Sequence, residues 1–249
     1  MQIHATNLGL SAGRGPVYGP LTFEVDSGLS VLRGDAGTGR TSLLLTLAGR
    51  MKHDAGTLTV GGLPLPRNLR PVQKKSAIAG FAGIDDLEAS VTVGAALRER
   101  RAWLAPWWSM VHKFNDEAVA EVCAPVFGGE PIPRANTLIW DLSDTQQFLL
   151  RITLAMMSSP KLLLVDDVEQ IRSTESRAVI WDRLAWIASG STSVVVSASS
   201  LDERLWEEMD IQPNIIDLGA HTEATEASGA ETTESTDTAP LHHLIEETV

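Results

Sequence analysis

A glycine-rich segment between a predicted strand and a predicted helix carries the clearest chemical pattern in the chain. Its residues are Gly34, Asp35, Ala36, Gly37, Thr38, Gly39, Arg40, Thr41 and Ser42. Seven of the first eight positions comply with the phosphate-loop pattern Gly-x-x-x-x-Gly-Lys-Ser/Thr. Glycines in such a loop let backbone N–H groups point at phosphate oxygens, and the following helix adds positive potential at its N-terminus. The segment predicts a phosphate-binding loop; the alternative is a Gly-rich turn without function.

Arg40 stands where this pattern has lysine. Lysine is a compact point charge on a slim stem, whereas arginine carries a planar and bulkier fork, so the exchange is not conservative at a shaped site. We therefore keep phosphate binding as the expectation and treat the catalytic geometry as doubtful. The next residue, Thr41, is expected to place its hydroxyl on Mg²⁺.

The strands and helices predicted along the chain place this loop in an α/β fold. The first 33 residues predict short strands separated by turns, and Leu162–Val165 is apolar on both faces, which is typical of a buried parallel strand. Further strands are predicted at residues 57–60, 76–82, 193–196 and 214–218. Helices are predicted at residues 41–50, 93–103, 115–122, 145–157, 176–188 and 201–209. Between them, Pro64, Pro66 and Pro71 predict an irregular connection.

Much of the negative charge of the chain lies at its C-terminal end. The 249 residues carry a net charge of -12, and residues 219–249 contain seven acidic side chains and no lysine or arginine. Residues 221–240 contain almost no large apolar side chain, so we predict that this tail is disordered. No basic stripe that would follow a phosphate backbone is present, which makes nucleic acid a poor candidate partner.

The cysteine content and the hydropathy of the chain indicate the cellular compartment in which we expect it. Cys123 is the only cysteine, which excludes an internal disulfide and a zinc site of several cysteines and favours a reducing compartment. No apolar run reaches the ~18 residues of a membrane-spanning helix, and the first ten residues lack the pattern of a secretory signal. We expect a cytoplasmic protein, which a partner could still hold at a membrane.

Several segments, taken in their order and spacing, resemble the nucleotide-binding domain of ABC transporters over about residues 3–218. Residues 34–42 resemble its Walker A motif, and Leu142–Gln146 (LSDTQ) falls where the LSGGQ signature belongs. Residues 155–167 resemble the approach to Walker B, and the 23 positions from Ser143 to Asp166 match the family's spacing. Residues 54–62 resemble the strand pair that follows the first helix.

This resemblance implies a P-loop NTPase fold, with a RecA-like α/β core, an antiparallel β subdomain and an inserted helical subdomain at about residues 84–158. The domain would cover residues 1–218, and residues 219–249 would form the tail. Members of the family bind ATP with Mg²⁺, pair head to tail as homo- or heterodimers, and act on a membrane permease. The resemblance therefore places the chain on the inner face of the cell membrane, held there by a permease subunit.

Roles can be carried over from the family one residue at a time. Residues 34–42 would bind the nucleotide, and Ser143 would contact it across the dimer. Thr41 and Asp166 would hold Mg²⁺. Asp167 stands at the position of the catalytic glutamate and is one methylene shorter, so its reach to the attacking water is doubtful.

Four other positions depart from the family's pattern. Gly83 replaces the Q-loop glutamine, and Ser199 replaces the switch histidine. In the signature, Asp144 and Thr145 replace two glycines, and side chains there block close approach to a partner's phosphate. We expect Asp144 instead to cap the helix that begins near Thr145.

Aromatic residues leave two open questions. No aromatic residue precedes Gly15, so Tyr18 is a weak candidate for stacking on adenine. Trp103, Trp107 and Trp108 lie within the expected helical subdomain. They are expected to pack in its core, as tryptophan usually does; the alternative is an aromatic docking surface for a membrane partner.

The retained and lost positions together support two hypotheses. Each lost orienting or charge-stabilising group typically slows catalysis by roughly 10²-fold or more, so we expect hydrolysis to be slow or absent and nucleotide binding to be weakened. The first hypothesis is an ATP-binding subunit that couples to a separate permease. The alternative is a non-catalytic module that senses ATP or only scaffolds a membrane partner. A GTPase is disfavoured because no Asn-Lys-x-Asp guanine motif is present.

Overall fold

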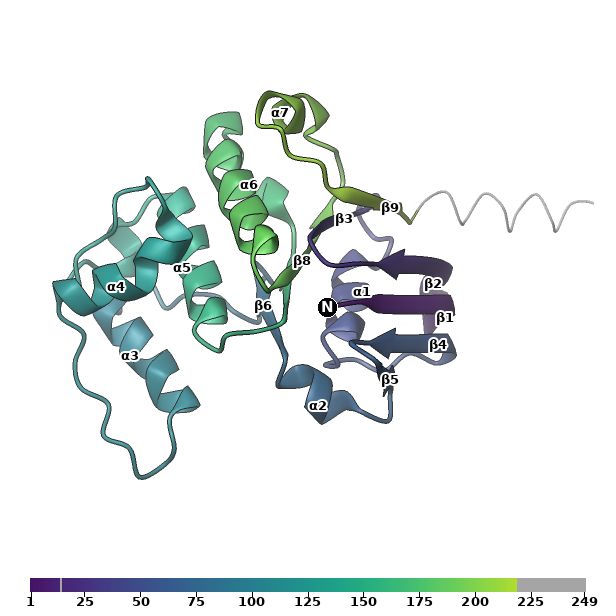
Figure 1. Cartoon of the computed structure of the whole chain (residues 1–249), viewed down its shortest axis with the longest axis horizontal. Helices are drawn as coiled ribbons and strands as arrows, with labels where there is room; N and C mark the ends of the chain where they lie inside the picture. Colours follow the sequence, from purple (N-terminus) through teal and green to yellow (C-terminus); the bar gives the residue numbers. More distant parts are fainter. Residues whose placement is uncertain (14, 219–249) are drawn as a thin grey trace, which may run out of the picture.

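The computed structural model describes residues 1–13 and 15–218 (Figure 1). The disorder predicted for residues 219–249 lies outside the described residues. Among the described residues, no helix combines the length and the apolar character that crossing a membrane requires.

An antiparallel sheet is built from the N-terminal part of the chain, in the strand order β2-β1-β4-β5. The strands are β1 Ile3–Ala12, β2 Gly15–Val25, β4 Ala55–Val60 and β5 Leu63–Leu65. The first two strands are longer than the short strands predicted from the sequence. The pairing of β1 with β2 continues through several shifts in register, as it does where a β-bulge adds a residue to one strand.

A five-stranded parallel sheet forms the centre of the molecule, in the order β6-β7-β8-β3-β9. Its strands are β3 Leu29–Arg33, β6 Ser76–Ala79, β7 Leu162–Val165, β8 Ser193–Ala198 and β9 Asn214–Asp217. Every residue of β7 and β8 is buried, because parallel strands are covered on both faces. The carboxyl ends of the strands meet at one edge, where open α/β sheets bind their ligands.

Alternating side chains of the parallel strands reach two separate cores, because successive side chains of a strand point to opposite faces. Leu162 and Leu164 of β7 pack with helix α1 (Arg40–Leu47) and the antiparallel sheet. Leu163 and Val165 of the same strand pack with the helices on the other face. Those helices are α3 Val93–Leu104, α4 Asp116–Phe127, α5 Asp144–Met156 and α6 Thr174–Ser189.

Helices α3, α4 and α5 follow β6 and precede β7 in the sequence. They lie on the side of the parallel sheet away from the antiparallel sheet (Figure 1). The remaining helices are α2 Leu69–Gln73 and α7 Glu203–Glu208, with 3₁₀ turns at Ile139–Asp141 and Val168–Gln170. The first of these, α2, forms where the prolines predicted an irregular connection. Pro71 is tolerated because it lies in the first turn, where an N–H has no intrahelical acceptor.

Candidate functional site

The glycine-rich segment forms a curved loop between β3 and α1. Gly37 and Gly39 have φ angles of 89° and 78°, in the left-handed region that glycine adopts without strain. A Cβ atom at Gly39 would lie 2.2 Å from the carbonyl oxygen of Val17, so only glycine fits there. Thr38 donates its amide and its hydroxyl to the carbonyl of Asp35, at 3.2 and 2.8 Å. The loop thus has a tight backbone turn that depends on its glycines.

Thr41, at the start of α1, lies directly against the carboxylate that follows β7. Its hydroxyl donates to Oδ2 of Asp166 at 2.5 Å, although 125 positions separate the two residues. Ser197 of β8 donates its hydroxyl to Oδ1 of the same carboxylate. Asp166 is buried, and hydroxyl and carboxylate oxygens are ligands that Mg²⁺ prefers. The two residues predicted to hold Mg²⁺, Thr41 and Asp166, therefore lie side by side.

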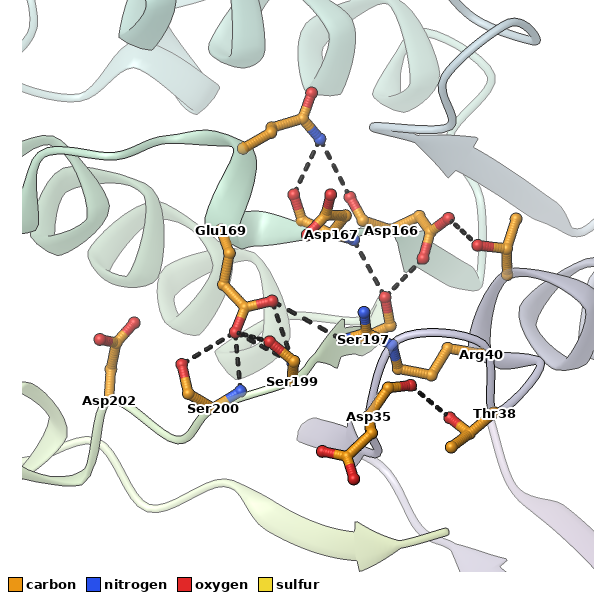
Figure 2. A network of polar contacts seen from close by, with 12 residues as sticks. Asp35, Thr38, Arg40, Asp166, Asp167, Glu169, Ser197, Ser199, Ser200 and Asp202 are labelled. Carbon is orange, nitrogen blue, oxygen red and sulfur yellow. Dashed lines mark hydrogen bonds and ion pairs between the residues drawn. The ribbon is translucent and has the colours of Figure 1, made fainter. Parts of the chain in front are cut away.

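Glu169, three positions after Asp166, turns its carboxylate toward the segment that follows β8 (Figure 2). The amides of Ser199 and Ser200 donate to it at 2.7 to 3.0 Å, and both hydroxyls donate at 2.7 and 2.8 Å. Partial burial alone would raise the pKa of Glu169. The hydrogen bonds from Ser199 and Ser200 outweigh it and lower that pKa to about 2. Glu169 is therefore ionised throughout the physiological pH range.

Arg40 extends from the phosphate loop toward the same carboxylate. Its Nη1 atom lies 3.6 Å from Oε2 of Glu169, and the two side chains are only 14% and 22% exposed. Nη1 is buried and donates no hydrogen bond within the described residues. The positive charge of Arg40 in the phosphate loop is thus balanced by the negative charge of Glu169, a carboxylate of the chain itself.

Asp167 occupies the position predicted for the catalytic base. Its φ angle is 49°, and its amide donates to the hydroxyl of Ser197 at 2.9 Å. Partial burial is the main cause that raises the pKa of Asp167, and the charge of Glu169 adds to it against the opposing effect of Arg40. A carboxylate with a raised pKa is a stronger base.

Gly83 lies in the loop after β6, with a φ angle of 75° and its amide donating to Asp86 at 2.8 Å. Asp85 anchors this loop. Its carboxylate accepts the amides of Gly80 and Phe81 at 3.0 and 2.7 Å, and it also pairs with Arg151 of α5. The position of the Q-loop glutamine therefore has no side chain, and the loop is held by the carboxylates of Asp85 and Asp86.

Ser143, and not Asp144, caps helix α5. The hydroxyl of Ser143 accepts the amide of Gln146 at 3.2 Å, and the Gln146 side chain accepts the amide of Ser143 at 3.1 Å. This capping box occupies the serine and begins the helix one residue earlier than predicted, so Asp144 lies in its first turn. The predicted cap at Asp144 was wrong because a serine with Gln three positions later satisfies two amides at once.

Tyr18 is not available to stack on a base. It is buried in the core between the antiparallel sheet and α1, and its hydroxyl donates to Thr46 at 2.8 Å.

Comparison with known proteins agrees with this geometry. A family model described as ABC transporter matches residues 19–170. The chain belongs to the ABC transporter family. It is 25% identical over 189 residues to the Nod factor export ATP-binding protein I of Rhizobium etli, which covers 75% of the chain and 57% of that protein. The same protein of Mesorhizobium japonicum is 26% identical over 194 residues, covering 78% of the chain and 54% of that protein. The chain thus spans a little over half the length of these relatives.

Solved structures support the fold of the ABC transporter family. The structure of an ATP binding subunit of an ABC transporter superposes with a TM-score of 0.63 at 18% identity, covering 88% of this chain and 86% of that one. The predicted P-loop NTPase fold, an α/β core with an antiparallel β subdomain, is therefore confirmed.

Within this family fold, the predicted site residues divide into two groups. The phosphate loop (residues 34–42), Asp166 and Asp167 meet at the carboxyl edge of the parallel sheet. Ser143 lies apart from them as the N-cap of α5, and its hydroxyl accepts the amide of Gln146 in the first turn of that helix. In the described part of the chain, no group of three or more His, Cys, Asp or Glu side chains is placed to hold a metal ion.

Three residues of the site were not predicted from the sequence: Glu169, Ser197 and Arg151. Each contacts a residue at least 30 positions away, so no local pattern marks it. One feature of the sequence could have indicated the contact between Glu169 and the serines. Glu169 is an acidic residue that follows Asp166 closely, and Ser199 and Ser200 form a serine pair after a buried strand.

The tryptophans at the end of α3 and in the loop after it lie on the surface, so the expectation of core packing was wrong. Trp103, Trp107 and Trp108 are 79%, 92% and 72% exposed. Trp107 and Trp108 pack edge to face against each other, with ring centroids 5.7 Å apart. Trp103 also lines a cavity of about 510 Å³ between the helices and the parallel sheet, beside Arg151.

Proposed function

We propose that the chain is the ATP-binding subunit of an ABC-type membrane transporter, which couples nucleotide binding to a separate permease with hydrolysis slow or lost. The observation that carries the proposal is the meeting of the phosphate loop, in which Arg40 replaces the usual lysine, with Asp166 at an edge where Gly83 and Ser199 replace groups that would promote hydrolysis. The residues that would bind nucleotide are thus retained, whereas groups that would orient water for hydrolysis are replaced.

The binding role falls to the loop and its two neighbours. Amides of residues 34–42 and the N-terminus of α1 would hold the phosphates. Thr41 and Asp166 would hold Mg²⁺ through their adjacent oxygens. Bound Mg²⁺ would neutralise part of the phosphate charge.

The chain lacks two of the groups that would orient water and the terminal phosphate for hydrolysis. Gly83 has no side chain to hold water, and the hydroxyl of Ser199 donates to Glu169. Asp167 has the raised pKa of a base but the shorter side chain. With roughly 10²-fold lost for each missing group, turnover would fall by about 10⁴-fold.

The experiment is calorimetry with nucleotide titrated into the purified full chain in the presence of Mg²⁺. Binding that is lost in Thr41→Ala and Asp166→Ala, and retained in the exposed control Thr57→Ala, supports the proposal. Turnover is measured on the same samples. Hydrolysis at the rate of an ordinary member of the family would contradict the loss of catalysis.

The second candidate is a non-catalytic module that keeps the fold and scaffolds a membrane partner. The ion pair between Arg40 and Glu169 favours it, because the phosphate loop is already compensated without nucleotide. Absence of binding to the wild-type chain at millimolar nucleotide would select this function.

The permease would meet the helical subdomain, proposed at about residues 84–158. The exposed tryptophans and the cavity beside Trp103 give this region an aromatic surface suited to a protein partner. Such a contact would hold the chain on the inner face of the membrane. A homo- or heterodimer with a second nucleotide-binding domain would bring Ser143 to the partner's phosphate loop.

A further inference from the structure

We propose that the carboxylate of Glu169 fills the place of the nucleotide's terminal phosphate, so that the site takes a nucleoside diphosphate in preference to a triphosphate. This inference rests on the proposed function, since it concerns the same loop. Glu169 would then determine which of the two nucleotides the site binds more tightly.

The position of the carboxylate is defined by three surrounding groups. Arg40 is the cation of the phosphate loop, and the residue at that position reaches the β- and γ-phosphates. Ser199 follows β8 at the same edge of the sheet, and its hydroxyl donates to Oε1 of Glu169 at 2.7 Å. Asp167, whose pKa the charge of Glu169 helps to raise, is the third neighbour. The carboxylate of Glu169 thus lies between Arg40 of the phosphate loop and Ser199 (Figure 2), and we place the terminal phosphate of a bound nucleotide at this point.

The contacts of Glu169 are those that a phosphate oxygen would make. Oε1 accepts the hydroxyls of Ser199 and Ser200 at 2.7 and 2.8 Å and the amide of Ser200 at 2.7 Å. Oε2 accepts the amide of Ser199 at 2.9 Å and faces Arg40. Amides, hydroxyls and guanidinium groups bind carboxylates and phosphates in the same way. The chain therefore supplies its own anion to this pocket of donors.

Binding of a third phosphate would disturb this arrangement. The phosphate must either displace Glu169 from its hydrogen bonds or lie beside an ionised carboxylate, and like charges in a partly buried site repel strongly. A diphosphate needs neither change, because its phosphates are held by the loop and α1. Glu169 thus penalises the triphosphate selectively.

A purely structural role would be to anchor the segment at Ser199 and Ser200. In that case replacement of Glu169 would change the affinities for the diphosphate and the triphosphate by the same factor, or would change neither. The ratio of the two affinities separates the roles, because only an anion in the phosphate pocket affects one nucleotide more than the other.

The test titrates MgADP and MgATP into the full chain and compares their dissociation constants in wild type, Glu169→Gln and the exposed control Glu175→Gln. We expect the wild type and the control to bind ADP at least about tenfold more tightly than ATP. In Glu169→Gln, ATP affinity should rise about tenfold while ADP affinity changes little. Thermal melting of each variant verifies its folding.

Each outcome is decisive. Tighter binding of ATP than of ADP by the wild type overturns the inference. This result needs no variant, so the inference can be tested even if Glu169→Gln does not fold. An unchanged ratio in Glu169→Gln overturns the inference and leaves nucleotide binding intact. Absence of binding by both proteins to both nucleotides overturns the proposed binding function as well.

Discussion

Arg151 of α5 donates to both carboxylate oxygens of Asp85, with Nε at 3.1 Å and Nη2 at 2.7 Å. The two residues are 66 positions apart, and the pair joins the helical segment to the loop after β6. Arg151 also donates to the side chain of Gln170 at 3.1 Å, and Nε2 of Gln170 in turn donates to the carbonyl of Asp167 at 2.8 Å. One arginine thus connects α5, the loop at Gly83 and the end of β7.

Replacing Arg151 by alanine should lower the free energy of unfolding by about 2–4 kcal/mol. Arg151 and Asp85 are 10% and 21% exposed, so removal of one partner leaves a largely buried charge with less compensation. Urea denaturation measures the change. The matched control is Arg204→Ala, which breaks an exposed i,i+4 pair and should cost less than about 0.5 kcal/mol. Equal effects of the two variants would contradict a structural role for Arg151.

Removing the cap of α5 should also destabilise the fold. Ser143→Ala abolishes one half of the capping box and is expected to cost about 1 kcal/mol. Asp144→Ala removes only a first-turn carboxylate and should cost about 0.3–1 kcal/mol. The two variants are compared by thermal or urea denaturation in one buffer. A larger loss for Asp144→Ala would assign the cap to Asp144 after all.

Cys123 should be unreactive in the folded chain. Burial raises the pKa of the Cys123 thiol to about 12, against a smaller opposing hydrogen bond with Thr153, so the thiolate that attacks thiol reagents is not populated. Because the folded pKa lies above the unfolded value, this group stabilises the fold fully below about pH 9 and loses that contribution toward pH 12. A disulfide reagent at pH 8 should label Cys123 only after denaturation. Rapid labelling of the native chain would refute this.

The exposed tryptophans should matter for the membrane partner and not for the fold. The double variant Trp107→Ser, Trp108→Ser is expected to melt within about 2 °C of the wild type, because surface substitutions cost little. In cells that contain the permease, the variant should move from the membrane fraction to the soluble fraction. Trp186→Ser, a half-exposed tryptophan on α6, is the control that should stay with the membranes. Unchanged fractionation of the double variant would argue against docking through this surface.

Local patterns in the sequence determined a large part of the structure. Residues 34–42 combine a short motif with a strand before it and a helix after it, and Leu162–Val165 is apolar at every position. Such patterns depend on neighbours along the chain, so they predict strands, helices and the phosphate loop without knowledge of the tertiary fold. The family followed from the order of these segments.

Contacts between distant residues were decided only by the tertiary structure. Glu169 receives its hydrogen bonds from residues 30 and 31 positions away, and Ser197 meets Asp166 because β7 and β8 are adjacent in the sheet. The exposure of Trp107 likewise depends on whether another element covers it, which hydrophobicity alone does not say. The sequence by itself determined which loop could bind phosphate. Only the packing of strands from distant parts of the chain decided that a carboxylate of the protein lies beside it.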